Sequence, residues 1–297
     1  MTNENRLNKF KNEYLGRSIS TICGYLIVVI TIIILSFITL KGIKLFTKDG
    51  YTLGEFLLKK TWNPESNRAE FGALIFISGS ILVTLGAIII STPLSIALSI
   101  FINIISPKIG GRFLKPAMEL FVGIPSVVYG WLGITLLVPA IKSIFKGIGF
   151  GLLSSIIVLS IMILPTITSI SSDAIKSIPK RYIEASYGLG ATRWQTIVKV
   201  IIPSSKNGIL TAIILGMARA FGEALAVQML IGNSIKFPRN ITDTTSTLTS
   251  IITMDMANTI FGTTWNDAIW SLALLLLIIS FMFILIIKII AKRGDVK

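Results

Sequence analysis

The sequence predicts an all-α membrane protein built as a bundle of six transmembrane helices. Of the 297 residues, 53% are hydrophobic and only 14% are charged, and the mean hydropathy is +0.80. Soluble domains carry about 25% charged residues. The long apolar runs exclude a β-barrel, whose strands alternate over about ten residues. Helices and closed barrels alone satisfy the backbone within lipid, so a helical bundle remains.

Six apolar segments are long enough to cross about 30 Å of hydrocarbon as helices. The first apolar run is too long for the core of a signal peptide, and no A-x-A cleavage site follows it, so we expect a retained helix. Pro93 lies inside the second segment and predicts a bend there. The predicted spans are 18–40, 74–105, 117–140, 149–171, 207–231 and 267–287.

The distribution of Lys and Arg predicts that both termini are cytoplasmic. Loops on the side of the N-terminus carry 17 basic residues and loops on the other side carry 10, which follows the positive-inside rule. A bacterial or archaeal plasma membrane is the expected location. The predicted organisation is a cytoplasmic tail (1–17), a first helix (18–40), an external loop (41–73), a five-helix core (74–287) and a second cytoplasmic tail (288–297).

The net charge of +14 does not predict a nucleic-acid-binding protein. The basic residues are spread over loops that flank the membrane, without the interleaved aromatic side chains that single strands need. The chain has no histidine, which excludes a His-based triad or a His zinc site, and Cys23 is the only cysteine. We therefore expect neither an intramolecular disulfide nor a metal site.

The predicted cytoplasmic loop 172–206 has the pattern of two short helices joined at Gly190. Pro179 suits the first turn of the first helix. Thr192 and Gln195 fit a capping box that begins the second helix. The loop is therefore expected to be an ordered unit and not a simple turn.

The second short helix is predicted to end near Lys199, with Pro203 separating it from the next span. Tyr182, Tyr187 and Trp194 lie on the two helices and leave two interpretations open. The pair could be interfacial, with its aromatic rings at the lipid headgroups. Alternatively, it could dock on a cytoplasmic partner.

The same loop resembles the EAA loop of ABC importer permeases. The matching residues are Glu184-Ala185-Ser186, then Gly190, then Val200-Ile201-Ile202-Pro203, at the spacing of the family motif. The resemblance implies the type I ABC importer permease fold. It also implies that Glu184, Ala185, Gly190 and Pro203 belong to coupling helices that sit in a groove of an ABC ATPase.

Further residues resemble phosphate-specific permeases of the PstC type. They are Gly123-Ile124-Pro125-Ser126-Val127-Val128-Tyr129-Gly130, Trp62-Asn63-Pro64 with Phe71-Gly72-Ala73-Leu74, and Met217-Ala218-Arg219-Ala220-Phe221-Gly222-Glu223-Ala224. The resemblance implies a permease subunit of an ATP-driven inorganic phosphate importer. Implied partners are a second permease subunit (PstA-type), an ABC ATPase (PstB-type) and an extracytoplasmic phosphate-binding protein (PstS-type).

Arg219 and Glu223 are charged residues inside the fifth predicted span. Two such charges facing lipid would cost roughly 5–7 kcal/mol, so we expect them to face the bundle interior or water. A spacing of four residues predicts a shared helical face on which they can meet. They could form a structural ion pair, or they could line an anion pathway, because arginine donors suit phosphate oxygens. The resemblance favours the pathway.

Alternative functions remain open from the residues alone. A proton-coupled secondary transporter would use Glu223 as a proton site, and a permease for another oxyanion or small solute would share the same fold. An integral membrane enzyme lacks support, since no paired carboxylates share a face. The chain has no G-x-x-x-x-G-K-[ST] motif, so we expect no cofactor on it and ATP with Mg on a separate ATPase subunit.

Overall fold

The computed structural model describes residues 16–66 and 68–293, so most of the first predicted tail and the last four residues of the second lie outside it. Its long apolar helices confirm the predicted number of membrane spans, which is six. They are Gly16–Thr47, Leu74–Ile105, Ser126–Phe145, Leu152–Lys176, Arg193–Phe221 and Thr264–Ile286.

Shorter helical elements subdivide or connect these spans. The first half of the chain contains α2 (Gly16–Gly42), α3 (Lys44–Thr47), α4 (Leu53–Leu58), α5 (Leu74–Ile100), the π-helical turn η2 (Phe101–Ile105), α6 (Pro107–Ile109), η3 (Gly110–Leu114), α7 (Lys115–Gly123), α8 (Ser126–Leu132), η4 (Gly133–Leu137) and α9 (Val138–Phe145). The second half contains α10 (Leu152–Lys176), α11 (Lys180–Gly188), α12 (Arg193–Thr196), η5 (Ile197–Ile201), α13 (Ile202–Phe221), α14 (Leu225–Leu230), α15 (Leu248–Asp255) and α16 (Thr264–Arg293).

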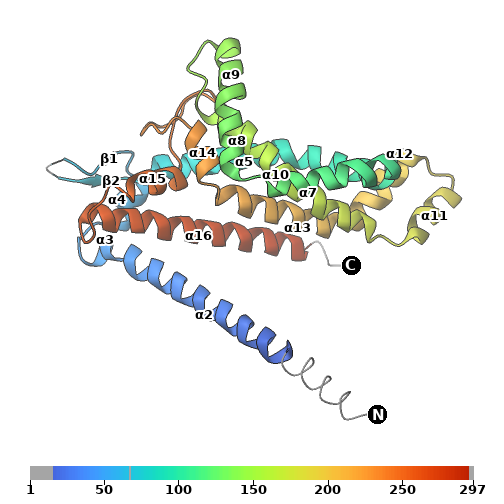
Figure 1. Ribbon diagram of the computed structural model, residues 1–297, viewed down its shortest axis with the longest axis horizontal. Helices are drawn as coiled ribbons and strands as arrows, with labels where there is room; N and C mark the ends of the chain where they lie inside the picture. Colours follow the sequence, from blue (N-terminus) through green and yellow to red (C-terminus); the bar gives the residue numbers. More distant parts are fainter. Residues whose placement is uncertain (1–15, 67, 294–297) are drawn as a thin grey trace.

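Different elements form the two ends of the bundle (Figure 1). The basic loop with α11 and α12 forms one end, and α3, α4, α15 and a short hairpin form the other. The hairpin strands, β1 (Trp62–Asn63) and β2 (Glu70–Phe71), are antiparallel, with Trp62 opposite Phe71. The Trp62 ring packs edge to face against Phe71 at 5.2 Å and against Phe76 of α5 at 5.3 Å, which anchors the hairpin on α5.

The core lies between α5, α10, α13 and α14, where aliphatic side chains such as Leu159, Ile163 and Leu230 are buried. Polar side chains four residues apart on α5 and its continuation η2 also donate hydrogen bonds to positions four apart on α10. This serine ladder adds partners on the facing helix for polar groups in an apolar interior. Ser99 Oγ and Asn103 Nδ2 also lie within hydrogen-bond distance of the Ser95 and Ser99 carbonyls, at 2.7 and 2.8 Å. Its rungs are Ser95 Oγ to the Leu164 carbonyl (3.1 Å), Ser99 Oγ to the Thr168 carbonyl (3.0 Å) and Asn103 Nδ2 to Ser172 Oγ (2.7 Å).

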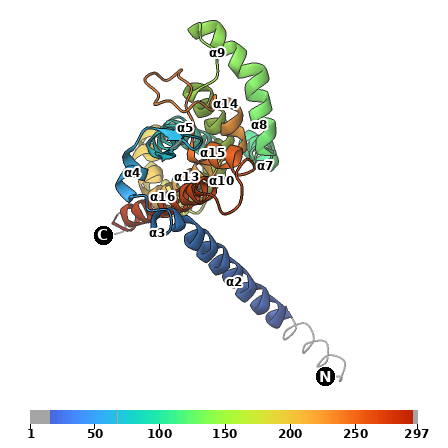
Figure 2. The ribbon, with the colours of Figure 1, turned by 90° about the vertical axis from the view of Figure 1, so that its left-hand side faces the viewer.

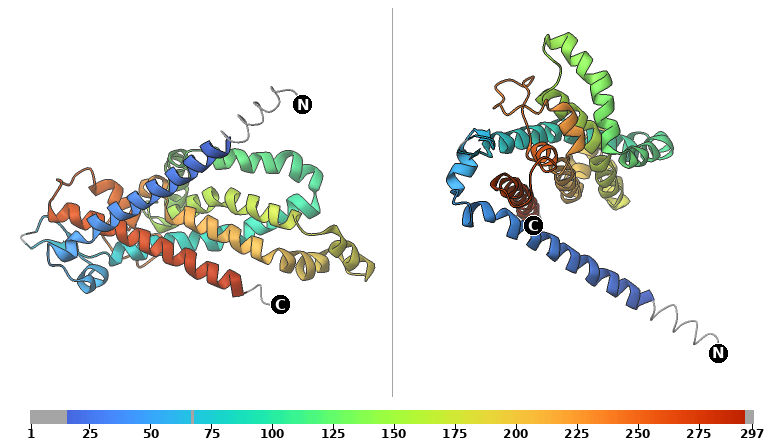
Figure 3. Two further views of the ribbon diagram at one scale, coloured as in Figure 1. Left: turned by 90° about the horizontal axis from the view of Figure 1, so that it is seen from below. Right: turned by 60° about the vertical axis from the view of Figure 1, so that its left-hand side comes forward.

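Helix α2 diverges from the bundle (Figures 2 and 3). The Phe37 ring contacts Trp270 of α16 at 5.2 Å, and Ser271 Oγ donates to the Gly42 carbonyl at 2.7 Å. Residues 16–37 are exposed in the isolated chain. An apolar helix with an exposed surface all round requires lipid or another membrane protein around it.

The prediction of one continuous third span over 117–140 is wrong. Helix α7 ends at Gly123, and Ile124 is extended because Pro125 disfavours the helical conformation in the residue before it. The chain then turns sharply, so that α8, η4 and α9 project from the bundle (Figures 1 and 3). The apolar helix runs over Ser126–Phe145 instead.

The fifth predicted span, 207–231, also has different limits. A continuous helical path begins at Arg193 in α12 and ends at Phe221. The predicted stop between Lys199 and Pro203 is therefore wrong. The π-helical turn η5 directly precedes Pro203, and such a wider turn accommodates the missing proline N–H without ending the helix.

Candidate functional site

Arg219 lies near the middle of the bundle and is half-buried. Its Nη1 donates to the Thr166 hydroxyl of α10 at 2.7 Å. Thr166 is 14 residues into the 25-residue α10, which corresponds to about 21 Å along an axis of about 37 Å. The Thr166 hydroxyl therefore fixes one side of the guanidinium at mid-depth.

The helix that carries Arg219 ends two residues later. The amide of Gly222 donates to the Ala218 carbonyl and that of Glu223 to the Ala220 carbonyl, each at 3.3 Å, and the chain then leaves the helical path. Glu223 consequently lies outside α13. The prediction that Arg219 and Glu223 share a helical face is wrong, because the helix ends between them.

Glu223 instead serves the start of the next helix. Its Oε1 accepts a hydrogen bond from the Ala226 amide at 3.2 Å, near the N-terminus of α14, where a negative charge is favoured. Its own carbonyl accepts from Thr249 Oγ1 of α15 at 2.9 Å. The surrounding small cavity also contains the hydroxyls of Ser80 and Thr84. Glu223 is thus placed by hydrogen bonds that do not involve Arg219.

Among residues 16–66 and 68–293, no carboxylate lies within 4.0 Å of the Arg219 guanidinium. The structural ion pair considered from the sequence is therefore not formed. Non-helical backbone at bilayer depth, such as that at residues 222–224, is tolerated where it is buried in protein or lines a cavity. A mid-depth arginine beside a broken helix suits transient binding of an anion.

The predicted coupling residues lie at the opposite end of the bundle from the hairpin. Glu184 and Ala185 are exposed on α11, and Gly190 has a φ of +79° in the turn to α12. The capping box of Thr192 and Gln195 is confirmed. Pro203 lies inside the continuous helix and not in the turn, so the structure separates it from the other three coupling candidates.

The tip between the two short helices is apolar and aromatic. The exposed fractions are 89% for Leu189 and 69% for Trp194. Beneath the tip, Ser186 Oγ and Thr196 Oγ1 are buried and 3.0 Å apart, which ties α11 to α12. A rigid helix pair with an exposed apolar tip has the surface expected of a docking element.

Arg193 is a residue that the sequence reasoning missed. Its Nη2 donates to the carbonyls of Ile104 and Ile105, the latter at 2.9 Å, at the end of η2. Arginine commonly binds the last carbonyls of a helix in this way. The loop helices are thereby connected to α5, which carries the serine ladder. The partners are 88 and 89 residues away in the sequence, so no local pattern could have indicated this contact.

The family model described as the binding-protein-dependent transport system inner membrane component matches residues 95–295. This match covers more than half of the chain. The chain belongs to this family. It is an ABC importer permease, and the resemblance predicted from the α11–α12 loop is confirmed. With its six apolar helices, this permease is a multi-pass membrane protein.

Relatives of known sequence match nearly the whole permease. The probable ABC transporter permease protein YqgH of Bacillus subtilis is 49% identical over 293 residues, which cover 98% of this chain and 94% of that protein. The phosphate transport system permease protein PstC of Mesorhizobium japonicum is 33% identical over 262 residues, or 82% and 79% of the two chains.

Solved structures support the predicted type I permease fold. A bacterial alginate ABC transporter in complex with an alginate pentasaccharide-bound periplasmic protein aligns with a TM-score of 0.63 and 16% identity, covering 96% of both chains. The MetNI methionine ABC transporter, in inward-facing conformations, aligns with a TM-score of 0.57 and 20% identity, covering 76% of this chain and 95% of that one. At these identities the likeness concerns the fold alone.

Proposed function

We propose that this permease imports inorganic phosphate as one half of an ATP-driven translocation path. The observation that carries the proposal is the Arg219 guanidinium, held at mid-depth by Thr166 and without a carboxylate partner among the described residues. Its remaining donors suit the planar, bidentate recognition of phosphate oxygens. Relatives that are named phosphate transport system permease proteins support the choice of anion.

Glu223 has a second role in the proposed path. Its carboxylate lies close in sequence to Arg219 but is bound at the start of α14. A negative charge near the pathway opposes tight retention of a phosphate ion, because like charges repel. Glu223 would therefore help the anion to leave, while Arg219 attracts it.

The proposed assembly supplies the energy from outside this chain. A second permease subunit (PstA-type) completes the path, an extracytoplasmic phosphate-binding protein (PstS-type) delivers the anion, and an ABC ATPase (PstB-type) binds ATP with Mg. This chain is proposed to bind no nucleotide and to catalyse no reaction. Glu184, Ala185 and Gly190 belong to the docking surface, and Pro203 lies in the helix that carries its movement to Arg219.

The experiment compares Arg219 variants in proteoliposomes that contain all four subunits. Arg219→Lys keeps the charge but loses the planar fork, so we expect phosphate uptake to fall about tenfold while ATPase docking persists. Thr166→Val is the matched control, because it removes the anchor and leaves the guanidinium. Sulfate and molybdate uptake, measured in parallel, test the choice of phosphate.

The double variant Arg219→Gln with Glu223→Gln separates a pathway role from a structural one. If both charges only support packing, the assembled double variant transports normally. If they line the path, assembly is retained and phosphate flux is lost. Robust phosphate uptake by a well-assembled double variant rejects the assignment of Arg219.

We further propose that both termini and the α11–α12 loop face the cytoplasm. Cys23 is the only cysteine, so Cys23→Ser gives a cysteine-free background. A cysteine at Ile260 is expected to react with impermeant reagents only from outside the cell, and one at Lys180 only from inside. The reverse labelling pattern contradicts the docking role as well as the orientation.

A further inference from the structure

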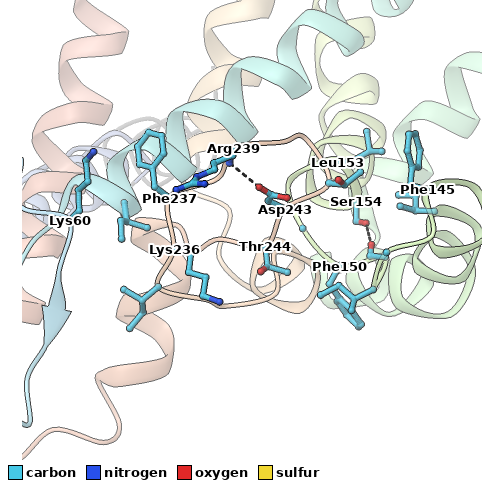
Figure 4. Close-up of a pocket in the computed structure, with 18 residues that line it drawn as sticks. Lys60, Phe145, Phe150, Leu153, Ser154, Lys236, Phe237, Arg239, Asp243 and Thr244 are labelled. Carbon is cyan, nitrogen blue, oxygen red and sulfur yellow. Dashed lines mark hydrogen bonds between the residues drawn. The ribbon is translucent and has the colours of Figure 1, made fainter.

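A large cavity lies at the hairpin end of the bundle, away from Arg219. Its volume is about 790 Å³, and its walls come from the end of α9, the start of α10 and the loop before α15. Figure 4 shows Lys236 and Arg239 on the loop, with Lys60 projecting from the side of the hairpin. We call this cavity, defined by Lys60, Lys236, Arg239 and Asp243, the vestibule.

The charge of the vestibule is predominantly positive. Its lining contains three basic side chains, Lys60, Lys236 and Arg239, and one acidic side chain, Asp243. The Asp243 carboxylate is already occupied, because its Oδ2 accepts from the backbone amides of Asn240 and Arg239 at 2.9 Å. These hydrogen bonds lower the pKa of Asp243, so it remains ionised and two positive charges are left in excess.

Backbone hydrogen bonds hold the loop against α10. The amides of Leu152 and Leu153 donate to the carbonyls of Asp243 (3.1 Å) and Ile241 (2.8 Å). Gly151 has a φ of +143°, and a Cβ there would lie 2.5 Å from the Asp243 carbonyl oxygen, which leaves room for glycine alone. The vestibule is therefore a preformed cavity with a fixed wall, which lowers the entropic cost of binding.

The basic side chains of the vestibule are exposed, and one of them, Lys60, is held by an aromatic contact. Lys60 Nζ lies 5.5 Å from the centroid of the Phe237 ring, which restrains an otherwise flexible side chain against the loop that carries Lys236. The vestibule also shares α10 with the candidate pathway, since Ser154 lines the cavity and Thr166 binds Arg219. Twelve residues separate these two positions, or about 18 Å along the helix axis.

We propose that the vestibule is a receiving site for the oxyanion, which it binds before the anion reaches Arg219. This inference rests on the proposed function and adds a second anion site at the opposite end from the coupling loop. Lys236 and Arg239 on the loop, and Lys60 on the hairpin side of the cavity, bind the oxygens of inorganic phosphate. Because the side chains are exposed, binding is weak and reversible, as a receiving site requires.

The test measures the local potential with a cysteine at Ile235, which lines the vestibule, in the Cys23→Ser background. The permease is labelled with an anionic and a cationic methanethiosulfonate. We expect the anionic to cationic rate ratio to exceed that of a cysteine at Ile260, at the same end but outside the cavity. Changing Lys236→Gln and Arg239→Gln is expected to lower the ratio about threefold at 0.15 M salt.

A matched pair of changes controls for general charge. Lys44→Gln with Arg68→Gln removes two exposed cations from the same end of the bundle but outside the vestibule, and we expect the ratio to stay unchanged. Millimolar inorganic phosphate is expected to slow labelling at Ile235→Cys at least threefold, and not at Ile260→Cys. An unchanged ratio in the vestibule variant, or no protection by phosphate, overturns the proposal.

Two further arms separate this proposal from its alternatives. If the phosphate-binding protein free of phosphate protects Ile235→Cys as well as phosphate does, the vestibule is a protein-docking surface and the proposal fails. Phosphate uptake by the unmodified four-subunit assembly is measured separately. Uptake without protection rejects the receiving site alone, whereas absence of uptake rejects the proposed function, whatever the labelling result.

Discussion

Gly190→Val tests how the α11–α12 loop presents its docking surface. Gly190 has a φ of +79°, and a Cβ at this position would have no heavy atom within 4 Å. The cost of Gly190→Val therefore comes from the backbone conformation and not from steric crowding of the new side chain. A residue other than glycine pays about 1–2 kcal/mol in the left-handed region, and a β-branched residue lies at or above the upper value. About 2 kcal/mol corresponds to a roughly thirty-fold change in an equilibrium.

The assay is the affinity of the ABC ATPase for the purified permease in nanodiscs, measured by titration, together with phosphate transported per ATP hydrolysed. We expect Gly190→Val to weaken ATPase binding by about thirty-fold. Gly190→Asn is the matched control, because asparagine tolerates the left-handed region, and its affinity should stay close to that of the parent. If asparagine weakens binding as much as valine, side-chain bulk and not φ is responsible, and the reasoning is refuted.

Three other substitutions test features described above. Arg193→Gln removes the hydrogen bonds to η2 and should lower the amount of phosphate transported per ATP hydrolysed in proteoliposomes. An unchanged ratio would show that this contact between α12 and η2 does not contribute to coupling. Burial raises the pKa of the Asp255 carboxyl above 3.8, so the protonated form stabilises the fold, and this stabilisation is lost as the pH rises through the folded pKa. Asp255→Asn should therefore raise the Tm at pH 7 but not at pH 3. An equal gain in Tm at both pH values would contradict this. Gly79→Ala places a Cβ 2.2 Å from the Ser246 carbonyl oxygen and should cost about 1–3 kcal/mol, whereas Gly24→Ala, with open space around it, should not lower the Tm.

The number of spans was predictable because the length of an apolar run is a property of the sequence alone. Local signals also succeeded, as the capping box at Thr192 and Gln195 illustrates, because both partners lie within one helical turn. The break after Phe221 was not predicted, since Gly222 within an apolar run has the same signature as a close-packed helix. The break at Pro125 was missed for a related reason, because prolines in membrane helices often cause kinks that leave the helix continuous.

The sequence predicted which residues form the candidate site but not how they are arranged. Arg219 and Glu223 were identified because charges inside an apolar segment are costly and therefore conspicuous. Their partners, Thr166 and the Ala226 amide, depend on where α13 ends and on which face of α10 it meets. Contacts over 53 residues, such as that of Arg219, have no periodic signature in a single sequence.

The four-residue spacing of the serine ladder restricts how α5 and α10 can move. If α5 slid along α10 by a single residue, all three hydrogen bonds between the helices would be broken, and Ser99 and Asn103 would keep only the carbonyls of their own helical segment. The register is restored only after four residues, a step of about 6 Å. The ladder therefore favours movement of the two helices together, and we expect relative motion at the contacts of this pair with α8 and α13. The hydrogen bond from Arg219 to Thr166 crosses one of these contacts, that between α13 and α10.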